Sequence, residues 1–177
     1  MDPDIQARAR AVDAWLEDND CRVIASYGVG AAALEWWLSR LRPSRKTICT
    51  DYADDTVRRL SLLAPELHVS RHDLRHDGPL AADVHLFHRI DTELSNREWR
   101  EVFLRFKSAS ILVVAAQVLD FRTLLQEVLD RPRMRLRRAS RAGFLRTRGA
   151  LGSLWLPTHH ALPLRMHDLD AWSLTPR

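Results

Sequence analysis

The sequence predicts an α/β fold: a doubly wound, mostly parallel sheet with helices on both faces and an antiparallel last strand. Short apolar segments alternate with amphipathic segments of about ten residues, which is the pattern of parallel strands joined by crossover helices. Residues Ser110–Gln117 are the most apolar of the short segments, as expected for a central strand covered on both faces. A glycine turn, Gly28-Val29-Gly30, leads from the first predicted strand into a helix.

The first half of the chain is predicted to form three strands and three helices. Residues 5–19 form an amphipathic helix, whose apolar side chains recur at helical spacing. Strands are predicted over residues 23–27, 47–50 and 67–71, and helices over residues 31–41 and 54–63 separate them. Pro43 and Pro65 follow the ends of these two helices, where a proline stops helical structure.

The second half continues the alternation and then changes character. A strand is predicted over residues 82–89, and Ser95 with Glu98 forms a capping box for a helix that extends to about Lys107. The strand 110–117 and a helix over residues 121–130 follow. The remaining predicted elements are a strand at 134–139, a short helix at 147–155 and a hairpin formed by residues 162–167 and 170–174. We therefore predict one domain, 1–177, with residues 1–20 as an N-terminal helix and 131–177 as a variable closing segment.

Composition predicts a globular protein of the cytoplasm. The chain is 46% apolar and 28% charged, and no apolar run approaches the ~20 residues that span a bilayer. The N-terminus is acidic and lacks the apolar core of a signal peptide, so no membrane partner is expected. Reduced, buried thiols are a better prediction for Cys21 and Cys49 than a disulfide between adjacent strands.

Basic residues are unevenly distributed along the chain. The segment Arg131–Arg148 contains eight arginines, and no acidic residue occurs between Asp130 and Asp168. On a strand, Arg133, Arg135 and Arg137 would share one face and could bind an anionic partner such as a phosphate or nucleic acid. The alternative is a solvated, arginine-rich strand and loop.

The segment from Arg22 to Asp51 carries the strongest functional signal. An apolar strand, a glycine turn, a helix and a second strand that ends on Asp51 follow one another. Glycines let the backbone approach a ligand closely, and a carboxylate at a strand tip can accept hydrogen bonds from two ribose hydroxyls. The segment therefore predicts a domain that binds a nucleoside cofactor.

This order of elements resembles the class I S-adenosylmethionine-dependent methyltransferases, with their Rossmann-like fold, and the tail from Gly143 to Trp155 looks like that of small bacterial proteins of this type. The specific matches are the segment Ser26–Gly30 and Asp51, whereas His72-Asp73-Leu74 and residues 83–91 match in position only. The resemblance implies S-adenosylmethionine as the cofactor. The cofactor-binding residues that it implies are Ser26, Tyr27, Gly28, Gly30, Asp51, Tyr52, Asp73 and Leu74.

The resemblance also implies a role for each of these positions. Gly28 and Gly30 would pass under the methionine part of the cofactor, and Asp51 would accept hydrogen bonds from the ribose. Tyr52 would pack on the adenine. The dipeptide Asp73-Leu74 would bind the adenine amino group through the carboxylate and the ring through a backbone N–H.

After the fourth strand, His88, Arg89 and Asp91 would face the transferred methyl group and the acceptor. His88 is the candidate general base, because a histidine can exchange protons near neutral pH. The alternatives are a strand-end histidine bonded to a loop carbonyl and, for Asp91 and Glu93, carboxylates that stabilise the positive end of the helix beginning near Ser95. No metal site is predicted.

Two positions depart from the family's pattern. An acidic residue usually stands two positions before the first glycine, where this chain has Ser26, and Ala32 stands at the position of the third glycine. These departures leave weaker cofactor binding, another ligand or a domain without activity as alternatives.

Three functions are therefore compared. The first is methyl transfer to a small-molecule acceptor, favoured because the chain has no sizeable extra domain for a macromolecular substrate. The second is a nicotinamide-dependent oxidoreductase, because Gly28, Gly30 and Ala33 fit the dinucleotide pattern with Asp51 about 20 residues further on. The third is a non-catalytic scaffold that binds an anionic partner through Arg131–Arg148.

Overall fold

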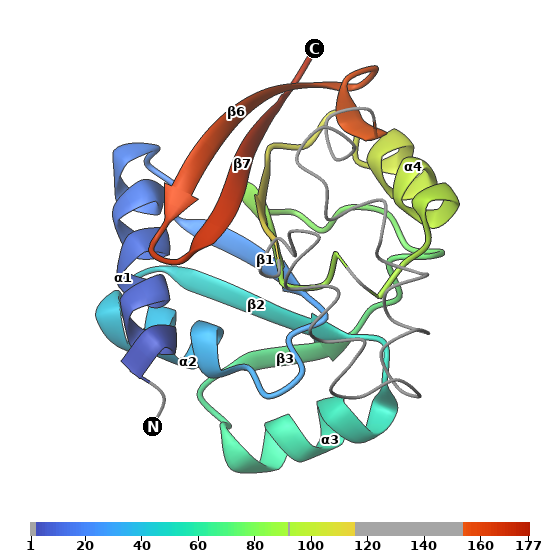
Figure 1. Cartoon of the computed structure of the whole chain (residues 1–177). Coiled ribbons are helices and arrows are strands. Elements are labelled where there is room, and N and C mark those ends of the chain that lie inside the picture. Colours follow the sequence, from blue (N-terminus) through green and yellow to red (C-terminus); the bar gives the residue numbers. More distant parts are fainter. Residues whose placement is uncertain (1–2, 92, 116–153) are drawn as a thin grey trace, which may run out of the picture.

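A computed structural model of the 177-residue chain describes residues 3–91, 93–115 and 154–177. Within these residues, seven strands form one sheet in the order β3-β2-β1-β4-β5-β7-β6 (Figure 1). The strands are β1 (Val23–Tyr27), β2 (Lys46–Asp51), β3 (His68–Arg71), β4 (Val84–His88), β5 (Ile111–Val114), β6 (His159–Met166) and β7 (Leu169–Pro176). The helices are α1 (Pro3–Asp18), α2 (Ala33–Leu41), α3 (Asp54–Leu63) and α4 (Asn96–Arg105).

The pairing of the strands confirms the predicted fold class. The first five strands pair in parallel, whereas β7 pairs antiparallel with both β5 and β6. The chain moves outward from β1 to β3 and then returns to the other side of β1 to form β4. The carboxyl ends of β1 and β4 therefore lie next to each other where the winding direction reverses, which is where open α/β sheets bind ligands.

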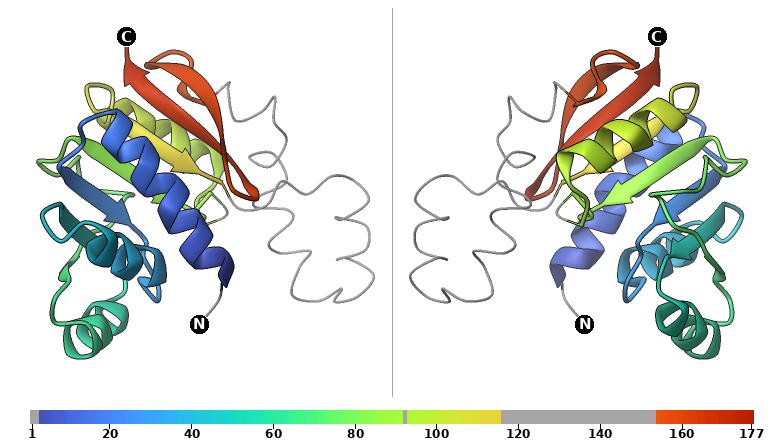
Figure 2. Two further views of the ribbon diagram at one scale, coloured as in Figure 1. Left: turned by 90° about the vertical axis from the view of Figure 1, so that its left-hand side faces the viewer. Right: turned by 90° about the vertical axis from the view of Figure 1, so that its right-hand side faces the viewer.

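Helices cover both faces of the sheet, as predicted (Figure 2). On one face, α1 and α2 contribute Val12, Leu16, Leu34 and Leu38 to a buried cluster with strand residues such as Leu86. The opposite face packs against α4 through an aromatic cluster that comprises Phe87, Trp99, Phe103, Phe106, Trp155 and Trp172. In the described part of the chain, no helix is both long and apolar enough to cross a membrane.

The predicted boundaries agree best where the apolar periodicity is strong. The strand 23–27 and the helix 54–63 have the bounds that were predicted. The final hairpin is longer than predicted, because β6 begins at His159 and β7 ends at Pro176. Pro163 lies within β6, which is an edge strand and therefore tolerates a residue without a backbone N–H. The predicted helix 121–130, the strand 134–139 and the arginine segment 131–148 lie outside the described residues.

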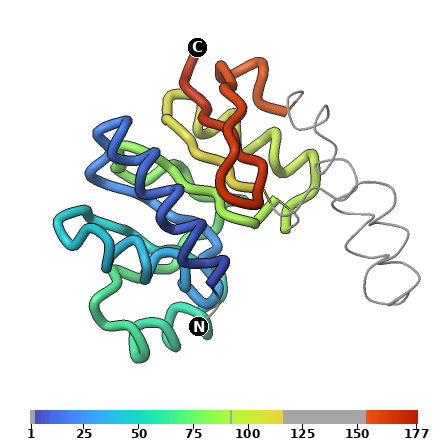
Figure 3. The backbone as a smooth tube through the Cα atoms, turned by 60° about the vertical axis from the view of Figure 1, so that its left-hand side comes forward, coloured from blue at the N-terminus to red at the C-terminus, as the bar shows by residue number. Residues whose placement is uncertain are grey.

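An ion pair joins the two ends of the chain. The Arg8 guanidinium on α1 donates through Nε and Nη2 to the two carboxylate oxygens of Asp168, at 2.8 and 2.7 Å. Asp168 lies in the turn of the β6–β7 hairpin, which lies beside α1 in Figures 1 and 3. Hydrogen bonds from Arg8 lower the pKa of Asp168 to about 2. The bidentate geometry fixes the hairpin turn next to the N-terminal helix.

The two cysteines are free and buried, which confirms the prediction of reduced thiols. Burial raises the pKa of Cys21 and that of Cys49, so both stay protonated near neutral pH. Cys49 packs beside α3 in a small cluster that also contains Ala32, Leu60 and Leu67.

The predicted capping box of α4 is present, and we expect it to contribute measurably to stability. Ser95 Oγ accepts from the Glu98 backbone N–H, and a Glu98 carboxylate oxygen accepts from the Ser95 backbone N–H at 2.7 Å. Ser95→Ala should lower the free energy of unfolding by about 1 kcal/mol, measured by urea denaturation. Ser95→Thr, which keeps the hydroxyl, is the matched control. Equal midpoints for the wild type and Ser95→Ala would contradict the role of the cap.

Candidate functional site

A cavity of about 580 Å³ opens at the carboxyl ends of the parallel strands. Its wall combines the glycine turn after β1, the end of β2, the loop after β3 and the end of β4, together with residues from the start of α2. The wall contains most of the predicted site residues: Gly28, Gly30, Asp51, Tyr52, Asp73, Leu74, His88 and Arg89. The topology therefore brings together side chains from both halves of the sheet.

The glycine turn is shaped by close packing at one glycine and open space at the other. Gly28 and Gly30 have φ values of +64° and +56°, which side chains rarely adopt. A Cβ at Gly28 would stand 2.8 Å from Ile90 Cγ2, whereas one at Gly30 would meet no heavy atom within 4 Å. Ala32 also has a positive φ, +52°, but its side chain is buried beside Cys49 and lies outside the cavity wall. The turn is thus formed with alanine at the third position.

Asp51 fixes the turn and keeps acceptor capacity toward the cavity. One carboxylate oxygen accepts from the Gly30 backbone N–H at 3.1 Å, and the other accepts from the Ala53 backbone N–H at 3.0 Å. Each oxygen retains a further lone pair, because an ionised carboxylate offers about four acceptor sites. A pair of vicinal hydroxyls on a ligand could donate to this carboxylate.

The loop after β3 forms the other end of the cavity. The Asp73 carboxylate accepts from the Arg75 backbone N–H at 3.0 Å, and Leu74 is buried in the wall. The Arg75 guanidinium lies over the Tyr52 ring, 5.5 Å from its centroid, and donates through Nε to Glu98 at 3.0 Å. An acidic side chain, an apolar side chain and an aromatic ring at one end suit a planar heterocycle with an exocyclic amino group.

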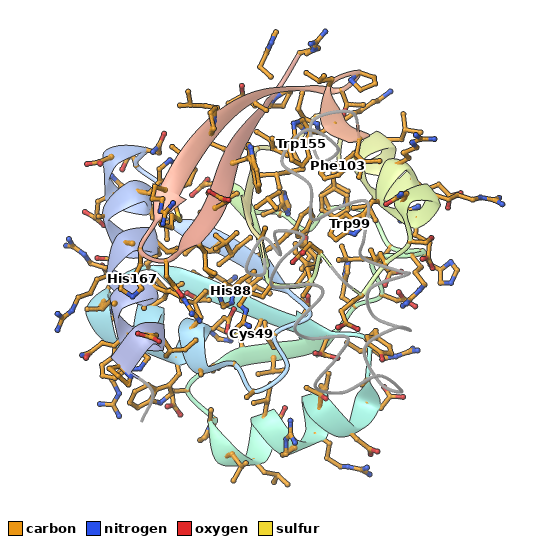
Figure 4. All side chains as sticks on the ribbon, in the orientation of Figure 1. Cys49, His88, Trp99, Phe103, Trp155 and His167 are labelled. Carbon is orange, nitrogen blue, oxygen red and sulfur yellow. The ribbon has the colours of Figure 1, made fainter. Side chains whose placement is uncertain are left out.

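His88 presents a neutral imidazole to the cavity. Burial, together with the charges of Arg89 and Arg8, lowers its pKa to about 3, and Asp168 opposes this shift. Its Nε2 is buried and has no hydrogen-bond partner among the described residues. Figure 4 shows His88 close to the turn that holds His167, in agreement with the electrostatic effect of Asp168. The side chain is therefore uncharged near neutral pH.

The cavity wall does not include the remaining predicted residues, Ser26, Tyr27 and Asp91. The Tyr27 side chain is buried on the α4 face, where its hydroxyl is 2.9 Å from His85 Nδ1. Asp91 is buried before α4, and its carbonyl accepts from Trp99 Nε1 at 3.2 Å. The cap of α4 itself comes from Ser95.

Glu35 is a residue of the wall that the sequence analysis missed. It lies on α2, is 2% exposed, and accepts a hydrogen bond from Ser26 Oγ at 2.6 Å. Burial raises the pKa of its carboxyl group. Its position offered a signal, because Glu35 follows Ala31 by four residues and so falls on the apolar stripe that continues through Leu34 and Leu38.

The cavity wall combines charged, polar and apolar side chains. Among the described residues, no group of three or more His, Cys, Asp or Glu side chains is arranged to hold a metal ion. Glu35 and Asp51 supply carboxylates to the wall near the turn, and Asp73 supplies one in the loop after β3. The glycine turn gives a ligand close access to the backbone, and the Asp51 carboxylate can accept hydrogen bonds from ligand hydroxyls.

Known structures share this fold. No family model and no curated protein matches the sequence. TnmH covers 96% of this chain with a TM-score of 0.76 and 16% identity, and human N-acetylserotonin methyltransferase, solved in complex with SAM, covers 95% with a TM-score of 0.69 and 16% identity. Plantazolicin methyltransferase BpumL, solved with a substrate analogue and SAH, covers 98% with a TM-score of 0.67 and 12% identity.

This chain spans 54%, 51% and 83% of those three proteins, so it is about half as long as the first two. At these identities the likeness concerns the fold. The fold is the class I methyltransferase-like fold that the sequence resemblance predicted.

We predict that the two glycines of the turn differ in their tolerance of a methyl group. Gly28→Ala should lower the free energy of unfolding by about 2–4 kcal/mol, because it adds the contact with Ile90 to the strain of a positive φ. Gly30→Ala should cost about 1 kcal/mol, from backbone strain alone. Urea denaturation of both variants tests the difference. Equal losses would show that the approach of Ile90 does not constrain the turn.

We predict that His88 reduces stability as the pH falls. Because the pKa of His88 is lowered to about 3, the unfolded chain binds a proton at this residue below pH ~6.5, whereas the folded protein does not until the pH approaches 3. Between pH 7 and pH 4, His88→Gln should therefore lose about 1–3 kcal/mol less stability than the wild type, measured by urea denaturation. If the wild type and His88→Gln lost the same stability between pH 7 and pH 4, His88 would already bind its proton in the folded state over that range.

Proposed function

We propose that this chain is an S-adenosylmethionine-dependent methyltransferase that acts on a small-molecule acceptor. The observation that carries the proposal is the order of groups along one cavity. The glycine turn, the Asp51 carboxylate and the Asp73-Leu74 loop follow one another in the order of the amino-acid, ribose and adenine parts of that cofactor. The fold, shared with proteins solved in complex with SAM or SAH, supports the same assignment.

In this proposal the two glycines give the backbone close access to the amino-acid part of the cofactor. Asp51, held by two backbone N–H groups, accepts hydrogen bonds from the ribose hydroxyls. Asp73 accepts from the adenine amino group, and Leu74 and Tyr52 pack against the ring. Ser26 and Tyr27 act from beneath the wall, where both are buried.

When bound, S-adenosylmethionine supplies a methyl group on a positively charged sulfur. The neutral His88 imidazole adds no positive charge to that end of the cavity, and its ring nitrogen can accept a hydrogen bond from an acceptor hydroxyl or amine. A pKa of about 3 makes it a weak base, so it orients the acceptor rather than fully deprotonating it. Arg89 lines the wall beside it, while Asp91 supports the following loop from a buried position.

A small acceptor fits the size of the site. The cavity of about 580 Å³ lies within the usual range of small-molecule sites, roughly 300–1,000 Å³, and the cofactor would occupy part of it. Proteins that share the fold include an N-acetylserotonin methyltransferase and a mitomycin 7-O-methyltransferase, whose names give small-molecule acceptors. Both exceed this chain in length, as it covers 51% and 54% of them.

Isothermal titration calorimetry tests the cofactor assignment. The wild type should bind S-adenosylmethionine and S-adenosylhomocysteine but not NAD, which the oxidoreductase alternative requires. Asp51→Ala should weaken binding of both sulfur nucleosides by about 10–100-fold, because it removes an ionised acceptor of two hydroxyls. Circular dichroism of the variant controls for folding. Binding of NAD alone, or an unchanged affinity in Asp51→Ala, would contradict the assignment.

A further inference from the structure

Glu35 is a buried carboxyl group in the wall of a ligand cavity. It is 2% exposed and lies one residue beyond Leu34, which also lines the wall. Its hydrogen-bond donor is Ser26 Oγ at 2.6 Å, a neutral hydroxyl. Among the described residues, no basic side chain forms an ion pair with Glu35. The described part of the protein thus places an acid in the cavity wall without an ion-pair partner.

Such a position is costly for a charged carboxylate. Transfer of an ionised group from water into a protein interior is unfavourable unless an opposite charge accompanies it. Burial accordingly raises the pKa of Glu35, and the hydrogen bond from Ser26 opposes that shift only in part. A cationic ligand group at this point would supply the missing charge.

We infer that Glu35 binds the α-ammonium group of the cofactor's amino-acid part. This inference rests on the function proposed above, which puts that part of the cofactor against the turn Gly28–Gly30. Glu35 follows Gly30 by five residues, and its carboxylate accepts a hydrogen bond from Ser26 near the end of β1. The family that the sequence resembles usually has an acidic residue at the position of Ser26. Here the serine at that position instead donates a hydrogen bond to Glu35, an acidic residue on α2.

Among the described groups around Glu35, none forms an ion pair with it. Ser26 on β1 is neutral, and burial keeps the Cys49 thiol on β2 protonated, with Glu35 raising its pKa further. Asp51, also on β2, is acidic, and the His88 imidazole on β4 is neutral. On α1, which packs against α2, Arg8 is already paired with Asp168, and Arg89 lines the cavity after β4.

A change of protonation accompanies this contact. In the free protein, burial raises the pKa of the Glu35 carboxyl group, and a bound ammonium group would lower it again. Binding should therefore release up to one proton from Glu35. Since proton release is easier at higher pH, the affinity for a ligand with the ammonium group should increase from pH 5.5 to 7.5.

Two ligands separate this contact from the rest of the site. S-adenosylhomocysteine carries the amino-acid part, whereas 5′-methylthioadenosine keeps the adenine and ribose but lacks that part. By isothermal titration calorimetry, Glu35→Gln should weaken S-adenosylhomocysteine binding by roughly 10–100-fold and change 5′-methylthioadenosine binding by less than about twofold. Titrations in buffers of different ionisation enthalpy should show proton release with S-adenosylhomocysteine in the wild type and its loss in the variant.

Two further variants serve as controls. Asp51→Asn should weaken both ligands, because the ribose is common to them. Glu101→Gln makes the same chemical change on the exposed side of α4 and should alter neither affinity. The proton count of the wild type needs no variant, so it tests the inference even if Glu35→Gln does not fold.

The outcomes are distinguishable. A selective loss of S-adenosylhomocysteine binding in Glu35→Gln, with proton release in the wild type, supports the contact. Equal weakening of both ligands would overturn it and give Glu35 a purely structural role. If the wild type and Glu35→Gln bound S-adenosylhomocysteine equally and the wild type released no proton, the inference would be overturned. The proposed function would stand. Failure of the wild type to bind either nucleoside would overturn the proposed function as well.

Discussion

The reversal of winding between β1 and β4 is the constraint on which the site depends. Because both strands run parallel and the chain leaves them in opposite directions, their carboxyl ends stand side by side where the cavity opens. The loops after β1 and β4 meet so closely that Ile90 Cγ2 lies where a Cβ on Gly28 would need space. A glycine is therefore needed there for packing as well as for its φ value. The same contact aligns the glycine turn with the wall residues after β4.

Residues near the two ends of the chain affect the pKa of His88 in the cavity wall. Arg8 and Asp168 bring the closing hairpin to the N-terminal helix, and both affect the pKa of His88 across the cavity wall. At the opposite end, Arg75 is held by Glu98, which also caps α4. The helix cap, the wall of the cavity and the aromatic ring of Tyr52 are thus connected through one guanidinium group. Local stability and the shape of the site are determined by shared contacts.

The fold and much of the wall were predictable because they depend on short-range patterns. The apolar run of β1, the glycine turn and Asp51 lie within one segment of sequence, and the capping box of α4 spans four residues. The burial of Tyr27 depends on strand alternation against α4, and the role of Glu35 depends on contact between a helix and a strand. Periodicity could have identified Glu35 as a charged residue on an apolar stripe, but only the packing of α2 on β1 shows that Ser26 is its partner.

The departures from the family's pattern are therefore not independent losses. Ala32 adopts the left-handed conformation of the glycine that it stands for, and its methyl group is buried in the core outside the cavity wall. Ser26 lacks a charge, but its hydroxyl donates a hydrogen bond to the Glu35 carboxyl group. Keeping an acid buried at this point costs stability, because an apolar residue would pack there at lower cost.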